Sequence, residues 1–184
     1  MVQILNKSYL KAIGYFKESI ELSGWSQKEI ESVTSNYDNI IYCCILAGDT
    51  ILARKWTELK MADKRTFASR AKDFVTLARY ELIEKHLSKG EQFLKKAILC
   101  DSTTFEAYVG LANIEMIRNN LDLAEEFLDK CFKIKMDYPQ LYQSFILLSL
   151  YQEDLETARY FINKLLKNEP YNPFALDVKK DFLE

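Results

Sequence analysis

A 34-residue repetition in the C-terminal half most strongly constrains the fold of this 184-residue chain. When residues 71–104, 105–138 and 139–172 are aligned without gaps, the same residue types fall at the same repeat positions. Position 4 is aromatic, position 20 is small and position 23 is phenylalanine; the middle repeat has Tyr108, Ala124 and Phe127 there. A fixed period of this length indicates an array of stacked repeats rather than one compact globule.

Each repeat contains two helical patterns joined by a turn. In 105–138, apolar residues recur at helical spacing up to Met116, Asn119-Asn120 interrupts them, and the pattern resumes at Leu121. The same spacing predicts helices over 71–84, 87–100, 139–152 and 154–168. A small residue at position 20 lets two antiparallel helices approach, because a larger one would overpack the crossing by about 1–3 kcal/mol. We therefore expect an all-α fold of antiparallel helix pairs.

The flanking segments extend this pattern with less regularity. Residues 34–67 resemble a degenerate copy, with a turn at Gly48-Asp49, but Lys60 departs from the apolar pattern. Ser26 and Glu29 have the spacing of a capping box, which predicts the start of a long helix toward Ala47. We divide the chain into N-terminal irregular or capping helices (1–33), repeats at 34–67, 71–104, 105–138 and 139–172, and a C-terminal capping helix (173–184).

Composition and motifs exclude several classes of function. The net charge of −2 lacks the basic excess that phosphate backbones require, and no apolar stretch of about 18 residues predicts a membrane span. The four cysteines have no zinc spacing, and the single histidine, His86, falls in a predicted turn. No phosphate loop or catalytic constellation is present. We expect no enzymatic activity, no cofactor and no metal, in an intracellular, cytoplasmic or nuclear protein.

The repeat positions resemble those of the tetratricopeptide repeat (TPR) family. Tyr108, Leu111, Ala112, Ala124 and Leu128 fit the family pattern at positions 4, 7, 8, 20 and 24. Departures are Glu81, Glu115 and Ser149 at position 11, and Ser102 and Met136 at position 32, where the family usually has proline. The resemblance covers about residues 34–184 and implies a right-handed superhelical array, a TPR-like α-solenoid.

The function implied by this resemblance is protein binding. We expect a non-enzymatic scaffold that binds a peptide or helix in a concave groove, or that self-associates within a larger assembly, for example as a subunit resembling TPR proteins of the anaphase-promoting complex or as a TPR chaperone. A homodimer is left open. The alternative is an RNA-binding helical-repeat protein, although the missing basic stripe argues against nucleic acid.

In TPR architecture the first helix of each repeat lines the concave face, which suggests the residues that contact a partner. We predict as partner-binding residues Lys72, Val75, Arg79, Val109, Asn113, Met116, Gln143, Leu147 and Tyr151. Two alternatives stay open. Met116, at position 12, could pack inside the array, and the N-terminal helix could fold back into the groove.

Overall fold

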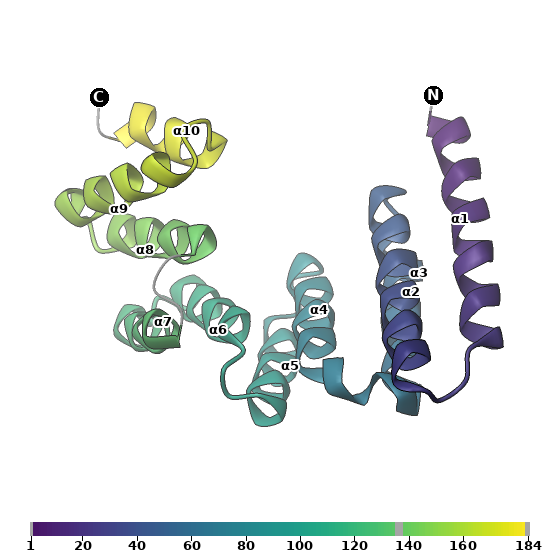
Figure 1. Cartoon of the computed structure of the whole chain (residues 1–184). Coiled ribbons are helices and arrows are strands. Elements are labelled where there is room, and N and C mark those ends of the chain that lie inside the picture. Colours follow the sequence, from purple (N-terminus) through teal and green to yellow (C-terminus); the bar gives the residue numbers. More distant parts are fainter. Residues whose placement is uncertain (1, 135–137, 183–184) are drawn as a thin grey trace. The chain divides into compact units, whose positions relative to one another are not determined.

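The computed structural model describes the backbone of residues 2–134 and 138–182 and the side chains of residues 8–66, 70–134 and 138–182 (Figure 1). Its regular elements over these residues are α1 (Val2–Leu22), α2 (Gln27–Leu46), α3 (Thr50–Ala62), a 3₁₀ helix η1 (Lys64–Ser69), α4 (Arg70–Ile83), α5 (Leu87–Cys100), α6 (Phe105–Ile117), α7 (Leu121–Ile134), α8 (Pro139–Tyr151), α9 (Leu155–Asn168) and α10 (Pro173–Phe182). The prediction of an all-α fold is confirmed.

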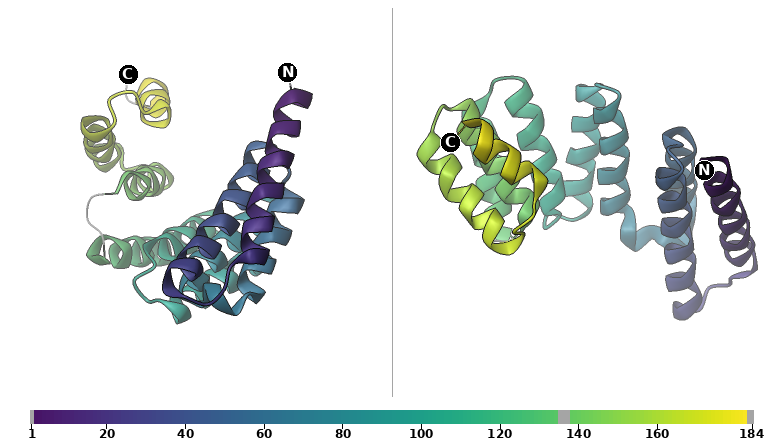
Figure 2. Two further views of the ribbon diagram at one scale, coloured as in Figure 1. Left: turned by 45° about the vertical axis from the view of Figure 1, so that its right-hand side comes forward. Right: turned by 90° about the horizontal axis from the view of Figure 1, so that it is seen from above.

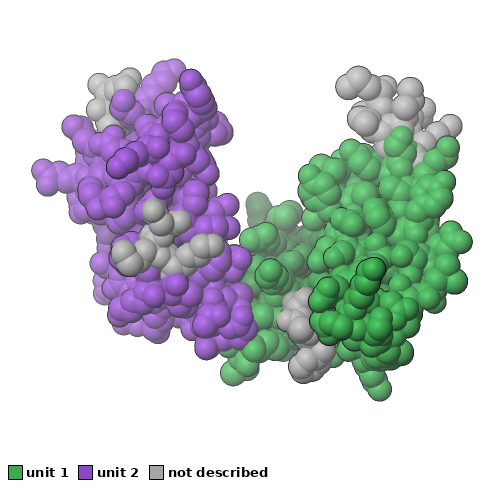
Figure 3. Space-filling view, in the orientation of Figure 1, with its two compact units in different colours: residues 1–100 green, residues 101–184 purple. Residues whose placement is uncertain are grey.

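Consecutive helices pack as antiparallel pairs: α2 with α3, α4 with α5, α6 with α7 and α8 with α9. Figure 2 shows these pairs from two further directions. The chain forms two compact units, unit 1 (residues 1–100) with α1–α5 and unit 2 (residues 101–184) with α6–α10 (Figure 3). The helix α2 begins directly after Ser26, whose side chain accepts from the Glu29 amide, so the predicted capping box is confirmed.

One turn geometry joins the two helices of every pair. The residue at repeat position 15 has a positive φ in all four turns: 75° at Gly48, 63° at Lys85, 62° at Asn119 and 59° at Glu153. In each turn the amide of position 16 then donates to the carbonyl of position 11, as for Asn120 and Glu115 at 2.9 Å. This arrangement is a Schellman motif, which ends one helix and reverses the chain immediately. The predicted turns at these places are confirmed.

Small side chains at position 20 bring the paired helices close together. Ala53, Ala124 and Ala158 are fully buried where the helices cross. Gly90 occupies the same position in the α4–α5 pair, and a Cβ atom there would lie 2.8 Å from Leu82 Cδ2. The glycine therefore allows an approach that alanine would block unless Leu82 moved.

A buried ion pair replaces apolar packing at one place in unit 1. Position 27 is buried and uncharged in the later repeats, but here it is Lys60, whose side chain is 2% exposed. Its Nζ lies 2.8 Å from Asp38 on α2 and 2.7 Å from the buried Asp73 on α4. The lysine thereby joins three helices through charge, which compensates for its removal from water.

The N-terminal helix is part of the core of unit 1. The helix α1 packs along α2, and its Ile20 is buried with Val33 and Ile40, while Ile13 and Phe16 pack against the same cluster. In unit 1, α1 thus covers one side of α2.

Candidate partner-binding surface

The first helices of unit 2 present two rows of side chains on one face. In α6 the row is Val109, Asn113 and Ile117, and in α8 it is Gln143, Leu147 and Tyr151. Residues four apart in a helix lie on the same side, so each row runs along its helix. The two rows occupy repeat positions 5, 9 and 13, and we call these six residues the unit 2 face.

Several contacts hold α6 and α8 beside each other. Phe105, at the start of α6, meets Tyr138, just before α8, in an edge-on ring contact with a centroid distance of 4.4 Å. Farther along, Ser144 Oγ donates to Asn113 Oδ1 over 3.3 Å. Met116 and Leu148 share one buried cluster beneath these contacts. The two rows are therefore neighbours on a supported surface.

The unit 2 face combines exposed apolar groups with half-buried amides. Ile117 is 61% exposed, Tyr151 53% and Leu147 36%. Asn113 and Gln143 are half-buried, as is Val109. Exposed apolar groups that gather on one face are typical of interaction sites.

The same exposure recurs at position 13 of unit 1. Leu46 on α2 is 49% exposed and Ile83 on α4 is 69% exposed. A large apolar residue thus stands exposed at position 13 of every repeat. Burial in the monomer does not account for it, because these side chains face water.

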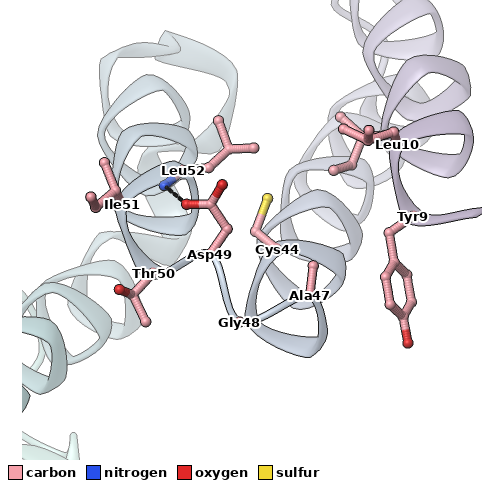
Figure 4. Close-up of a pocket in the computed structure, with 10 residues that line it drawn as sticks. Tyr9, Leu10, Cys44, Ala47, Gly48, Asp49, Thr50, Ile51 and Leu52 are labelled. Carbon is pink, nitrogen blue, oxygen red and sulfur yellow. Dashed lines mark hydrogen bonds between the residues drawn. The ribbon is translucent and has the colours of Figure 1, made fainter. Parts of the chain in front are cut away.

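A separate pocket lies in unit 1 between α1 and the turn from α2 to α3 (Figure 4). It has a volume of about 360 Å³, and Leu10, Ile13, Leu52 and Cys44 contribute apolar lining. Asp49 at its rim accepts the Leu52 amide at 2.9 Å, which caps α3. Burial raises the pKa of the Cys44 thiol to about 11, so this sulfur stays protonated and is a poor nucleophile.

One cluster in unit 1 brings together side chains that can ligate metals: Glu81, Glu84 and His86. Arg54 donates to both carboxylates, and His86 Nδ1 lies 2.9 Å from Glu81 Oε2. Burial raises the pKa of Glu81, but hydrogen bonds from Arg54 and His86 outweigh it and hold the pKa below its ordinary value. The cluster is therefore an ion-pair network, in which a metal would compete with the guanidinium.

Comparisons with known proteins identify the architecture. Neither protein-family models nor curated protein sequences match the chain. Among solved structures, yeast Tom70 is similar with a TM-score of 0.72 and 16% identity, over 96% of this chain and 36% of Tom70. YrrB, described as a TPR protein with an unusual peptide-binding site, is similar with a TM-score of 0.59 and 15% identity, over 97% of this chain and 88% of YrrB.

A third similar structure is the Cut9–Hcn1 hetero-tetramer of the APC/C, with a TM-score of 0.66 and 14% identity, over 86% of this chain and 34% of the matched chain. All three likenesses extend over most of the helices described above. The chain adopts the TPR fold. At identities of this size the likeness establishes the fold alone.

The TPR register places most of the predicted partner-binding residues on accessible surface. Val109, Asn113, Gln143, Leu147 and Tyr151 make up five of the six residues of the unit 2 face. Lys72 and Arg79 are exposed on α4 of unit 1. By contrast, Val75 and Met116 are 6% and 3% exposed, so their side chains are buried in their own units.

The sequence prediction left Ile117 out, although it lies next to Met116 and carries the larger exposure in the TPR fold. The signal that identifies it is the large apolar residue at position 13 of every repeat. Among the described residues, none of the helices combines the length and apolar character that crossing a membrane requires.

Proposed function

We propose that this protein is a non-enzymatic TPR scaffold that binds a segment of another protein on the unit 2 face. The observation that carries the proposal is the pair of exposed apolar groups, Ile117 and Tyr151, at the same position of two neighbouring helices. An apolar surface with a few placed polar groups suits a docked peptide, whose side chains bury against it.

The amides between the apolar groups support a peptide as the ligand. Asn113 and Gln143 are half-buried at positions 9 and 5, where their donors and acceptors can pair with a peptide main chain. YrrB, which shares the fold, is itself described as having a peptide-binding site. Pairing two copies of the chain through this face, as in a larger assembly, is the competing outcome.

The test uses peptides selected from a random display library against the full chain. The double variant Ile117→Ser with Tyr151→Ser removes the apolar groups of the face. We expect this variant to bind the selected peptides at least about tenfold more weakly, which corresponds to about 1.4 kcal/mol of binding free energy. The matched control is Leu155→Ser with Tyr160→Ser, which removes exposed apolar groups of the same kind, 47% and 55% exposed, from α9.

Binding that survives the face variant but is lost in the control would overturn the proposal. Light scattering of both variants separates the competing outcome. If the wild-type chain is a dimer and the face variant is a monomer, the face joins two copies and does not bind a foreign peptide.

A further inference from the structure

We infer that the segment bound by unit 2 is cationic: an extended peptide in which apolar residues alternate with lysine or arginine. The inference rests on the proposed function and adds the chemistry of the partner. It comes from the charges that border the unit 2 face, which belong to this chain and are not required by the TPR fold.

Two carboxylates continue the rows of the face onto α10. Asp177 and Asp181 lie 34 residues beyond Gln143 and Leu147, at repeat positions 5 and 9. They are four residues apart on one side of α10, and both are exposed. The helix packs on α9, and its Ala175 and Val178 belong to one buried cluster with Ile162 of α9 and with Tyr142 and Ile146 of α8.

A third carboxylate stands at the opposite border. Glu106 is half-buried at position 2 of α6, one turn before Val109. Over the described residues of unit 2, positions 2, 5, 9 and 13 of the first helices hold three carboxylates and no lysine or arginine. A peptide lying across these rows meets negative charge at both borders and apolar groups between them.

The lysines of α10 occupy other repeat positions than the carboxylates. Lys179 and Lys180 occupy positions 7 and 8, where α6 has Leu111 and Ala112 buried against other helices. In α10 this side is exposed. Lys179 lies on the opposite side of the helix from Asp177 and Asp181, whereas Lys180, three residues after Asp177, borders that carboxylate on the helix surface.

In unit 1 the side chains at corresponding repeat positions carry the opposite charge. Positions 2 and 9 of α4 are Lys72 and Arg79, both exposed. The acidic border is therefore a local property of unit 2. Complementary charge across an interface raises the association rate and excludes partners of the wrong sign, while the apolar contacts supply most of the affinity.

The test measures fluorescence anisotropy of three labelled peptides of about ten residues with the full chain, from about 50 to about 300 mM NaCl. The first alternates leucine with lysine, the second leucine with glutamate and the third serine with lysine. We expect the leucine–lysine peptide to bind about tenfold more tightly than either of the others, because it alone has both the charge and the apolar groups.

The decisive variant is Asp177→Asn with Asp181→Asn. It should weaken binding of the leucine–lysine peptide about fivefold, because two exposed ion pairs with the peptide are lost. The affinity of the variant for this peptide should also depend less on the NaCl concentration. The matched control, Glu126→Gln with Asp129→Asn, makes the same charge change at exposed positions of α7 and should leave binding unchanged.

Two results would overturn the inference while the proposed function stands. One is equal binding of the leucine–lysine and leucine–glutamate peptides, with Ile117→Ser and Tyr151→Ser still abolishing both. The other is that the α7 control loses as much affinity for the leucine–lysine peptide as the α10 variant does. The total charge of the chain would then be responsible, and not the position of the carboxylates. If the Ile117 and Tyr151 variant binds like the wild type, the proposed function itself fails.

Discussion

Lys60 Nζ lies 2.7 Å from Asp73 Oδ1, and the two side chains are only 2% and 4% exposed. The lysine belongs to α3 and the aspartate to α4, so this buried pair joins one helix pair to the next. Removing Lys60 takes away the ammonium group that compensates for the burial of the Asp73 carboxylate.

Lys60→Met should therefore cost about 3–5 kcal/mol in the free energy of unfolding, measured by urea denaturation. Adding Asp73→Leu to this variant should recover most of the loss, because two apolar groups then pack where two charges were. If Lys60→Met alone lowers the free energy of unfolding by less than about 1 kcal/mol, the carboxylate of Asp73 is solvated in that variant and the expectation is wrong.

Tyr142→Ala tests the packing of unit 2. Tyr142 is 3% exposed, and its ring centroid lies 6.0 Å from that of Phe161 on the paired helix. The cavity left behind should cost about 3–5 kcal/mol in the free energy of unfolding. Tyr151→Ala on the same helix is the control, because Tyr151 is 53% exposed and its loss should change stability by no more than about 0.5 kcal/mol.

Arg65→Ala tests the attachment of α1. Arg65 Nη1 donates to the carbonyl oxygens of Ser23 at 2.7 Å and Ile20 at 3.3 Å, while Nη2 pairs with Asp63. The substitution removes a charged cap from the end of α1. We expect amide hydrogens of α1 to exchange at least about tenfold faster, since a charged hydrogen bond contributes about 1.5–3 kcal/mol. Amides of α8 serve as the internal reference, and equal acceleration there would indicate general destabilisation.

Glu81 should make folding sensitive to acid. Its pKa in the folded chain lies below the ordinary 4.5, because Arg54 and His86 favour the charged carboxylate despite burial. A lowered pKa contributes stability above the unfolded value, and this contribution disappears as the pH falls through the folded value. Urea denaturation from pH 6 to about pH 3 should show a shallower decline for Glu81→Gln than for the exposed control Glu126→Gln. Parallel curves would contradict the assignment.

The helix pairs and their turns could be predicted from the sequence because both depend on local patterns. Ser26 and Glu29 lie three residues apart, and the turn residues Asn119 and Asn120 interrupt a regular apolar spacing, so short-range rules were sufficient. The division of the chain into repeats and end segments remains a prediction.

The sequence could not reveal pairings between different helices. Lys60 was recognisable as a break in the apolar pattern, but Asp38 and Asp73 lie on two other helices, 22 and 13 residues away. Met116 and Ile117 posed a related problem. The helix α6 is apolar on several sides, so the periodicity alone did not decide that Met116 is buried and Ile117 exposed.

The positive φ at position 15 also makes the hairpins interchangeable. Since Asn119 and Glu153 end their helices in the same way, an in-frame tandem duplication of residues 105–138 would insert a second complete hairpin with the same internal turn. Such a chain would gain a third parallel row of position 5, 9 and 13 side chains without any new core having to evolve. Proteins of this type can thus lengthen their recognition surface by gene duplication, in steps of one hairpin.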